Sequence, residues 1–367
     1  MKKTDVKTQG IMDIISAKIL NRERISAEEG LALYHKADLL SLAAMAEKRR
    51  FEIHPKRRVS FVIDRNINYT NICISQCRFC AFYAAPGSKK GYVISKEDLR
   101  KKIQETLDLK GTQILLQGGI NPDLTLDYYI DLLKFIKDNF DIHVHGFSPP
   151  EIHFIAEKSS LSVGETIRRL KHAGLDSIPG GGAEILCDEI RKKVSPGKCM
   201  TEDWLEVMRQ AHKQGMRSSA TMMFGHIEAP RHIFEHMEKI RALQDETGGF
   251  TAFIPWTFQP DNTRIKVKKT GAVKYLRVLA LSRLFFDNID NIQASWVTQG
   301  DKIGQTALFF GANDMGSTMI EENVVASAGV EFMLSEKELR HLISEAGFEP
   351  VQRDCFYNDI YMKYQTP

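Results

Sequence analysis

Three cysteines stand close together in the segment NICISQCRFCAFY, which covers residues 71–83. Cys73, Cys77 and Cys80 have the spacing C-x3-C-x2-C, and no further cysteine follows for about a hundred residues. Cysteine thiolates hold iron–sulfur clusters, and a [4Fe–4S] cluster normally takes four of them. Three thiolates would leave one iron open to a small molecule that binds the metal. The spacing therefore favours an iron–sulfur site with an open position.

Two other interpretations of these cysteines stay open at this point. Zinc prefers four ligands in tetrahedral geometry, often as two C-x2-C pairs or with histidines. Here only Cys77 and Cys80 form such a pair. The three thiols could also be a buried group that holds no metal. Cys187, Cys199 and Cys355 lack any ligand spacing, and we interpret them as ordinary thiols.

The elements that must position the cysteines form a repeated pattern between residues 59 and 330. Strand-like runs rich in Val, Ile, Phe and Thr are followed eight times by amphipathic stretches, as in 111–119 and then 125–140. Repeated alternation of this kind implies a parallel sheet with helical crossovers. Eight units over ~270 residues fit an α/β fold of the TIM type, a (β/α)8 barrel, which usually takes ~250. A doubly wound sheet is the structural alternative.

We expect three regions along the chain. Residues 1–58 carry apolar residues at helical spacing and predict an N-terminal helical extension. Residues 59–330 form the barrel. Residues 331–367 predict a closing helix and a short strand that pack on the barrel.

The polar and glycine-rich segments follow the predicted strands, just as the cysteines do. The carboxyl ends of barrel strands face one side of the molecule, where active sites form. We therefore expect one mouth to collect all of these segments. They are Cys73–Cys80, Gln117–Gly119, Phe147–Pro149, Gly180–Gly182, Gly225–His226 and Asn313–Asp314.

The bulk composition is that of an ordinary globular protein. The chain has 367 residues, of which 43% are hydrophobic and 26% charged, and its net charge is +3. Such a small charge gives no reason to expect a nucleic acid or an anionic membrane as partner. Asp13 and Lys18 interrupt the apolar residues near the start, which argues against a secretory signal. No run approaches the ~20 apolar residues that span a bilayer. We expect a cytoplasmic protein, in which clustered cysteines are more often metal ligands than disulfides.

The cysteine motif resembles that of the radical S-adenosylmethionine (SAM) enzymes, and Phe79 before the last cysteine makes the resemblance specific. The resemblance implies that Cys73, Cys77 and Cys80 hold a [4Fe–4S] cluster whose open iron binds S-adenosyl-L-methionine. An electron from the cluster then cleaves S-adenosylmethionine into methionine and a 5′-deoxyadenosyl radical, which abstracts hydrogen from a substrate. It also implies an electron donor such as flavodoxin or ferredoxin.

A narrower resemblance covers about two thirds of the chain. The segments resemble, in the same order, the futalosine-pathway radical enzymes of menaquinone biosynthesis. They are DRNINYTNICISQCRFCAFY, LLQGGINPDL, GFSPPEI, IPGGGAEIL, TMMFGHIE, IPWTFQP, ASWVTQGDKIGQTAL and GANDMGSTMIEENVV. The last two look most like the cyclases of that pathway, which convert dehypoxanthinyl futalosine to its cyclic form.

The reaction follows from this resemblance. It implies hydrogen abstraction at C4′ of the substrate ribose, addition of the carbon radical to the benzoate ring, and oxidation of the ring radical. A sister enzyme such as aminofutalosine synthase is the nearest alternative, because the sisters share the earlier motifs. A non-catalytic zinc- or cluster-binding protein is a distant alternative.

The resemblance also implies residues that bind S-adenosylmethionine. Gln117, Gly118 and Gly119 occupy the place of the family's Gly-Gly-Glu segment, although the acidic residue is absent here. An ordinary glycine turn is the alternative. Ser148 and Glu184, which follow the third and fourth strands, could bind the ribose or the amino group.

Arg191, one helix further on, could pair with the carboxylate of S-adenosylmethionine, since guanidinium and carboxylate match as a fork. A solvated surface charge is the alternative for Arg191, and a helix cap is the alternative for Ser148. Gly180–Gly182 would let the main chain approach the cofactor closely.

Two residues are candidates for the base that takes the proton lost in the reaction. His226 follows the strand of the segment TMMFGHIE, although it could equally be a satisfied core histidine. Thr318 and Glu321 form a predicted capping box at a helix start. That leaves Glu322 without a structural role and free to face the site.

The remaining polar residues give weaker predictions. His143 and His145 lie two apart on a strand and so share a face. A substrate contact by His145 is more expected than a metal site formed by the pair. Asn313 and Asp314 end the last strand, where we expect polar substrate contacts.

Overall fold

The computed structural model describes residues 3–330 and 332–360. Its named strands pair in parallel in two sheets. The seven-stranded sheet contains β2 (Asp64–Asn68), β3 (Gln113–Gln117), β4 (His143–Gly146), β5 (Ser177–Ile178), β6 (Arg217–Phe224), β7 (Phe250–Thr257) and β8 (Asn291–Ile292), in that order. The three-stranded sheet has the order β10 (Glu349–Gln352), β1 (Arg58–Val62) and β9 (Asp314–Ser317).

The two sheets are connected at both edges. Only Ile63 separates β1 from β2, so the segment 58–68 runs through both sheets. At the other edge, an isolated parallel bridge joins Gln293, just after β8, to Asp314 in β9. The strands thus close around an interior in sequence order. A doubly wound sheet requires a reversal of strand order, so this alternative is excluded. The predicted barrel-type α/β fold is confirmed. Its strands are divided between two sheets instead of forming one continuous sheet.

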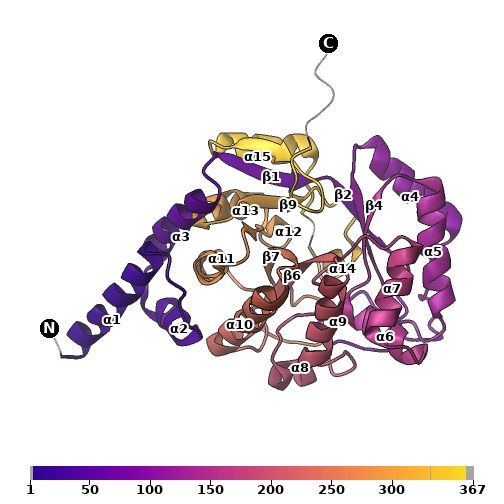
Figure 1. Cartoon of the computed structure of the whole chain (residues 1–367), viewed down its shortest axis with the longest axis horizontal. Helices are drawn as coiled ribbons and strands as arrows, with labels where there is room; N and C mark the ends of the chain where they lie inside the picture. Colours follow the sequence, from indigo (N-terminus) through magenta and orange to yellow (C-terminus); the bar gives the residue numbers. More distant parts are fainter. Residues whose placement is uncertain (1–2, 331, 361–367) are drawn as a thin grey trace, which may run out of the picture.

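Helices cover the outside of the strands, as Figure 1 shows. In α5, Tyr129, Leu132, Leu133 and Ile136 form the buried face that the sequence pattern predicted. The covering helices are α4 (Lys96–Asp108), α5 (Leu126–Asn139), α6 (Pro149–Lys158), α7 (Val163–Ala173), α8 (Asp188–Val194), α9 (Thr201–Lys213), α10 (Pro230–Thr247), α11 (Ala272–Phe285) and α13 (Asp301–Ala307). Two one-turn helices, α12 (Trp296–Gln299) and α14 (Asn323–Ala326), instead contribute residues to the wall of the interior cavity.

The connection between β5 and β6 differs from the prediction. The sequence predicted one helix there, and the structure has two, α8 and α9. Helix α8 is short and ends before Pro196 and Gly197. A second helix, α9, is therefore needed to return the chain to the start of β6, and it buries Trp204 and Met208 against the barrel.

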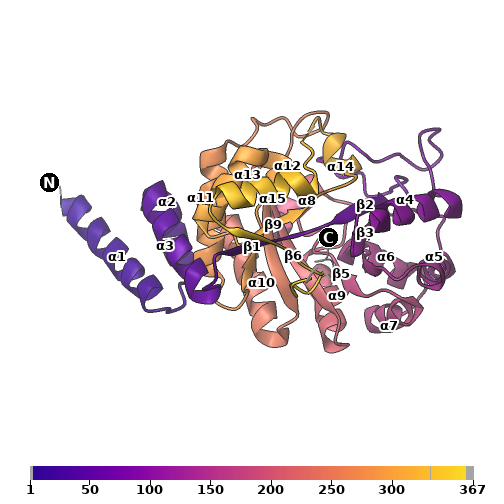
Figure 2. The same ribbon diagram turned by 90° about the horizontal axis from the view of Figure 1, so that it is seen from above.

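Three helices precede the barrel: α1 (Lys3–Leu20), α2 (Ala27–Lys36) and α3 (Leu39–Ile53). Ser26 and Glu29 form a capping box that starts α2. Helix α2 packs so closely on α10 that a Cβ atom at Gly30 would lie 2.4 Å from the ring of Phe234. Helix α1 projects away from the body beyond α2 and α3 (Figure 2).

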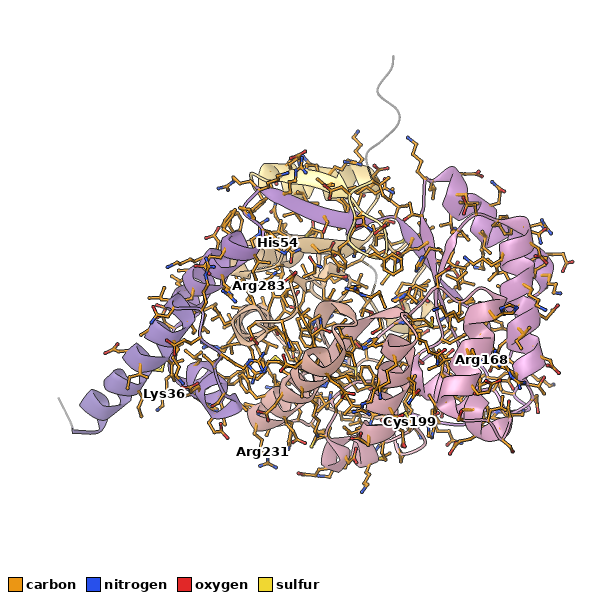
Figure 3. All side chains as sticks on the ribbon, viewed as in Figure 1. Lys36, His54, Arg168, Cys199, Arg231 and Arg283 are labelled. Carbon is orange, nitrogen blue, oxygen red and sulfur yellow. The ribbon has the colours of Figure 1, made fainter. Side chains whose placement is uncertain are left out.

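Helix α3 is anchored by hydrogen bonds to the segment before β8. His54 at the end of α3 donates to the carbonyl of Asp290 (2.9 Å), which also accepts from Arg283 (2.6 Å). Figure 3 shows Arg283 and His54 close together inside the left half of the molecule. The buried side chain of Arg283 thus donates to a main-chain carbonyl that has no hydrogen bond within a helix or sheet.

The C-terminal region adds to the three-stranded sheet. Helix α15 (Glu336–Glu345) precedes β10, which pairs with β1. The turn 353–357 then contacts the amino ends of the strands, where Phe356 meets the ring of His143 edge-on at 5.1 Å. Within residues 3–330 and 332–360, none of the helices has the length and apolar character needed to cross a membrane.

Candidate active site

The barrel encloses a cavity of about 390 Å³. At the carboxyl ends of the strands the cavity is lined by Cys73, Cys77 and Cys80. At the opposite end it is lined by Arg353 and Tyr357 from the C-terminal turn. The cavity therefore extends along the interior of the barrel between these two groups, which lie far apart in the sequence.

The cysteine loop is held by its main chain. Cys73 donates its N–H to Ala84 (2.9 Å), and Cys80 donates to the carbonyl of Cys77 (3.2 Å). Burial raises the pKa of Cys77 to about 12, and the charges of the neighbouring cysteines add to this effect, while Lys198 opposes it. The Cys77 thiol is therefore protonated when free, and a bound metal would have to displace its proton.

The predicted Gln117–Gly119 segment lines the cavity beside the cysteines. A Cβ atom at Gly118 would lie 2.5 Å from the ring of Tyr69, and one at Gly119 would lie 2.2 Å from the carbonyl oxygen of Ile72. Only glycine permits this close approach of the cysteine loop to the end of β3.

A buried carboxylate, that of Glu151, lies beside the Gln117–Gly119 segment, although the sequence lacks the family's glutamate after the glycines. Glu151 accepts hydrogen bonds from Gly118 N–H (3.0 Å), Tyr69 Oη (2.6 Å), Ser148 N–H (2.7 Å) and Ser148 Oγ (2.5 Å), and it lines the cavity. Burial raises the pKa of Glu151. The prediction missed Glu151, although Ser148-x-x-Glu151 is a capping-box pattern at a strand end. Ser148 itself both caps α6 and lines the cavity.

Glu184 lies in the cavity wall and pairs with a lysine that the sequence did not indicate. Lys198 Nζ lies 2.7 Å from Glu184 Oε1 and 5.2 Å from the ring centre of Phe79. Burial alone would lower the pKa of Lys198. The nearby Glu184 and Cys77 have the larger, opposite effect, so the pKa of Lys198 is raised. Lys198 thus stays charged beside the cysteines, paired with the carboxylate of Glu184. Lys198 lies 14 residues after Glu184, beyond the reach of a helical i,i+4 pattern, so no local sequence signal indicated the pair.

The structure corrects the expectation for Arg191. Its side chain is fully buried and does not line the cavity. Its guanidinium donates to the carbonyls of Gly182 (3.1 Å), Ala183 (2.5 Å) and Cys199 (2.6 Å). Arg191 therefore supports the glycine-rich loop from behind, because helix α8 turns its side chain away from the interior.

The structure also corrects the expectation for His226. Gly225 adopts φ +92°, and the turn directs His226 under the ring of Phe258, 6.2 Å between ring centres. Its Nε2 bonds the carbonyl of Met223 (3.1 Å), and Nδ1 lies 3.4 Å from Glu228. His226 does not line the cavity and is a buried histidine, but only Nε2 has a hydrogen-bond partner among the described residues, whereas Nδ1 has none.

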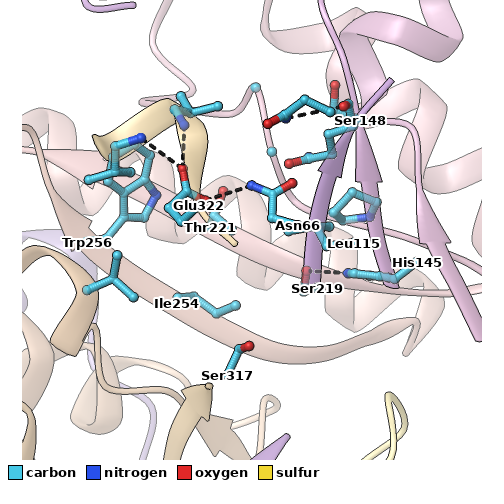
Figure 4. Close-up of a pocket in the computed structure, with 18 of the residues that line it drawn as sticks. Asn66, Leu115, His145, Ser148, Ser219, Thr221, Ile254, Trp256, Ser317 and Glu322 are labelled. Carbon is cyan, nitrogen blue, oxygen red and sulfur yellow. Dashed lines mark hydrogen bonds between the residues drawn. The ribbon is translucent and has the colours of Figure 1, made fainter. Parts of the chain in front are cut away.

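Glu322 lines the cavity, as expected, but the predicted helix start was wrong. The helix-capping residue is Glu322, which accepts from the N–H groups of Val324 (2.7 Å) and Val325 (2.8 Å). Glu321 instead pairs with Lys102 at 2.5 Å. Asn66 donates to the other oxygen of Glu322 at 2.7 Å, as Figure 4 shows. Burial raises the pKa of Glu322.

Two amide side chains of the cavity wall have unpaired acceptors. Asn66 and Gln113 are almost fully buried and line it. Their nitrogens donate to carboxylates, Asn66 to Glu322 and Gln113 to Asp64 (2.8 Å), which fixes the orientation of both amides. Both amide oxygens are left without a donor among the described residues. Polar residues at alternate positions of a buried parallel strand were the signal that could have found them.

His145 lines the cavity, which leaves the predicted substrate contact a prediction, and its imidazole is already satisfied within the protein. Ser177 Oγ lies 2.7 Å from His145 Nδ1 and 2.7 Å from His143 Nε2, and 3.4 Å from Cys355 Sγ. The ligand atoms of these two histidines and Cys355 lie within 4.8 Å of one another. The serine hydroxyl stands between them and bonds each one. Burial lowers the pKa of His145 to about 3, so its ring is neutral.

The expectation for Asn313 and Asp314 was wrong, because their side chains form buried structural bonds. Asn313 accepts from Arg283 (2.6 Å), and Asp314 pairs with Arg353 (2.6 Å). Neither residue lines the cavity.

A parallel barrel with three cysteines at the carboxyl mouth of its interior cavity is typical of the class of radical SAM proteins. Residues 67–240 match the Radical SAM superfamily, and residues 247–365 match the CofH/MqnC C-terminal region. The FeFe-hydrogenase maturase HydG from Carboxydothermus hydrogenoformans has a similar fold, with a TM-score of 0.75 over 96% of this chain and 82% of that one, at 18% identity. Methylornithine synthase (PylB) gives 0.69 over 92% and 97%, at 16% identity.

Relatives with higher identity narrow this class. Cyclic dehypoxanthine futalosine synthase from Halalkalibacterium halodurans is 50% identical over 95% of both chains. The protein of the same name from Streptomyces coelicolor is 44% identical over 92% of this chain and 86% of its own. A 5-amino-6-(D-ribitylamino)uracil–L-tyrosine 4-hydroxyphenyl transferase from Methanopyrus kandleri is 41% identical over 90% and 91%. The chain therefore belongs to the CofH/MqnC family of radical SAM enzymes.

Proposed function

We propose that this enzyme converts dehypoxanthinyl futalosine to cyclic dehypoxanthinyl futalosine in menaquinone biosynthesis. The observation that carries the proposal is the 50% identity, over 95% of both chains, with a relative that bears the name of this cyclase. The match covers 95% of both chains, so the proposal concerns the whole protein rather than one segment of it.

The residues around the cysteine loop fit a [4Fe–4S] cluster with one open iron. Cys73, Cys77 and Cys80 would hold the cluster, and the other soft ligands of the cavity, His145 and Cys355, lie toward its opposite end. When bound, the cluster and S-adenosyl-L-methionine supply the 5′-deoxyadenosyl radical. The proposal includes a one-electron donor such as flavodoxin or ferredoxin.

The walls next to the cysteines would bind S-adenosylmethionine. Gln117, Ser148, Glu184 and Lys198 line this part of the cavity, and the glycines Gly118 and Gly119 leave room for a ligand there. Lys198 offers a cation to the cofactor carboxylate, the role that the sequence had assigned to Arg191. Glu184 accepts from Lys198 and keeps it in place at 2.7 Å.

The substrate would occupy the polar part of the cavity toward the barrel floor. The unpaired oxygens of Asn66 and Gln113 lack hydrogen-bond donors, and hydroxyl groups of a ribose supply such donors. The enclosed walls exclude water and stray hydrogen donors from a reactive intermediate. Glu322 is the candidate base, because its carboxylate faces this space and its raised pKa makes it a stronger proton acceptor.

The test is an anaerobic assay of the reconstituted enzyme. Purified protein with a rebuilt cluster receives a chemical reductant, S-adenosylmethionine and dehypoxanthinyl futalosine, and mass spectrometry follows the products. We expect 5′-deoxyadenosine and the cyclic product together, and we expect Cys77→Ala to lose both along with most of its bound iron. Formation of 5′-deoxyadenosine without cyclic product would refute the substrate assignment.

A second candidate is the 4-hydroxyphenyl transferase activity that relatives at 41% identity are named for. It would join 5-amino-6-(D-ribitylamino)uracil with a fragment of L-tyrosine. Aminofutalosine synthase, the alternative that the motifs left open, is tested in the same assay with its own substrate. The higher identity to the cyclases favours the cyclase assignment.

A further inference from the structure

Two surface segments border the cysteine loop, residues 71–83. The first begins at Ala84, whose carbonyl accepts from Cys73 N–H at 2.9 Å. The second contains Arg264, which donates its N–H to the carbonyl of Arg78 at 2.8 Å. The Arg264 guanidinium also bonds main-chain carbonyls of the cysteine loop. Loop and segments therefore form one continuous surface over the cysteines.

This surface is predominantly positive, although the exposed Asp261 directly precedes its second stretch. The sequence from residue 71 to residue 91 contains no Asp or Glu, and neither does the sequence from 262 to 269. Seven cations lie in these two stretches, and all of them are exposed. They define what we call the cationic face: Arg78, Lys89, Lys90, Arg264, Lys266, Lys268 and Lys269.

The charge of the cationic face is not neutralised within the protein. In the part of the chain that the structure describes, none of its seven members forms an ion pair, whereas arginines elsewhere pair with carboxylates, as Arg24 does with Asp245 and Asp287. Ile74, between the first two cysteines, exposes 41% of its surface beside these cations. An exposed apolar residue with unpaired charges around it is typical of a protein contact surface.

We propose that the cationic face docks an acidic electron-donor protein that delivers one electron to the cluster. This inference rests on the proposed function, because only a cluster held by the three cysteines needs the electron. In each encounter the reduced donor loses one electron and the cluster gains it. Complementary charge steers such short-lived redox encounters and raises their association rate.

A nucleic acid is a different occupant of a basic surface, and the observations favour it less. The chain as a whole carries a net charge of only +3, whereas nucleic-acid-binding domains are usually strongly basic. The face is formed by loops and turns, and no helix within it could enter a major groove.

The experiment compares two charge-reversed variants of the cluster-loaded enzyme. The first changes four lysines of the cationic face that make no side-chain hydrogen bond among the described residues, K89E, K90E, K268E and K269E. The matched control changes four exposed lysines on α2, α3, α5 and α9, K36E, K48E, K134E and K213E. Arg264 stays unchanged because it supports the cysteine loop.

Cluster reduction is followed by the loss of visible absorbance, without substrate, so the result does not depend on the identity of the product. The reductants are reduced flavodoxin, reduced ferredoxin and titanium(III) citrate. We expect the first variant to be reduced about tenfold more slowly than the wild type by at least one protein donor at low salt, and normally by titanium(III). The control variant should behave like the wild type with every reductant.

Three outcomes would overturn the docking proposal. The first is equal reduction rates of wild type and first variant by both protein donors. The second is reduction of the wild type that does not slow as salt is raised. The third is a loss of duplex DNA binding in the first variant without a change in donor-driven reduction. If the wild type is reduced normally but forms no cyclic product, the proposed function fails while the docking proposal stands.

Discussion

At the scale of single residues, the site is organised by which polar atoms the protein satisfies and which it leaves free. The carboxylate of Glu151 has four donors and is structural. The amide oxygens of Asn66 and Gln113 have none among the described residues. Leaving a buried acceptor unpaired costs about 1–3 kcal/mol, which a bound ligand recovers when it supplies the donor.

Replacement of Gln113 tests this acceptor. We expect Gln113→Met to raise the KM for dehypoxanthinyl futalosine about tenfold, which corresponds to about 1.4 kcal/mol of lost binding. Leu115→Met, at the next cavity-facing position of β3, is the matched control and should change KM less than about twofold. Equal KM values for both variants would show that Gln113 does not contact the substrate.

Replacement of Glu322 and His226 tests the assignment of the base. Glu322→Gln should lower kcat by about 100-fold or more, because an amide cannot take the proton, while the substrate Kd stays nearly unchanged. His226→Gln should retain kcat within about threefold, because His226 does not line the cavity. The reverse ranking of the two variants would restore His226 as the candidate base.

The roles of individual site residues could be predicted from the sequence only where a local pattern indicated them. The spacing of the three cysteines and the position of Gln117–Gly119 after a strand correctly placed both groups in the wall of one cavity. Lys198 was missed because its pairing with Glu184 is tertiary, and Arg191 was misassigned because the sequence does not tell which way a side chain of α8 points.

At the scale of elements, the C-terminal turn closes the end of the barrel opposite the cysteines. Arg353 pairs with Asp314 through two hydrogen bonds, 2.6 Å and 3.0 Å, and this pair links the turn to β9. Both side chains are almost fully buried. A buried pair of this kind stabilises little in net terms, but loss of one partner leaves the other charge unpaired.

Removal of Arg353 should therefore be strongly destabilising. We expect Arg353→Met to lower the free energy of unfolding by about 3–5 kcal/mol in urea titrations. The double variant Arg353→Met, Asp314→Asn should recover part of this loss, because no charge then remains buried. Equal losses in the single and double variants would show that the turn is held by packing alone.

The strands were more predictable than the connections between them. All eight predicted strand-then-helix units are present, because alternation of buried strands with amphipathic helices is a local pattern. The second helix between β5 and β6 and the start of α14 were not found. Both features depend on the three-dimensional path of the chain between elements, which a local sequence pattern does not contain. Glu322 caps α14 because of where the fold places it, not because of a capping-box pattern.

At the scale of the whole molecule, several buried histidines are kept neutral. Burial lowers the pKa of His236 and of His145 to about 3, and that of His212 to about 4. In the unfolded chain these side chains titrate near pH 6.5. Between these values the unfolded state binds more protons than the folded state, so their contribution to stability is present above pH 6.5 and is lost as the pH falls.

Replacement of His236 isolates one of these contributions. His236 Nδ1 accepts from Leu186 N–H at 3.0 Å, and a glutamine oxygen can accept in its place. Between pH 6 and pH 4.5, we expect His236→Gln to reduce the slope of unfolding free energy against pH by up to about 1.4 kcal/mol per pH unit. Identical slopes for the wild type and the variant would show that His236 is not kept neutral by the fold.

The central claim is that one cavity joins the three cysteines to a site for dehypoxanthinyl futalosine. A side-by-side anaerobic assay tests it most directly. The reconstituted enzyme is given dehypoxanthinyl futalosine in one reaction and 5-amino-6-(D-ribitylamino)uracil with L-tyrosine in another. We predict that only the first reaction forms a product derived from its substrate, the cyclic compound. Turnover of the uracil and tyrosine pair, with no cyclic compound from the first reaction, would contradict the assignment.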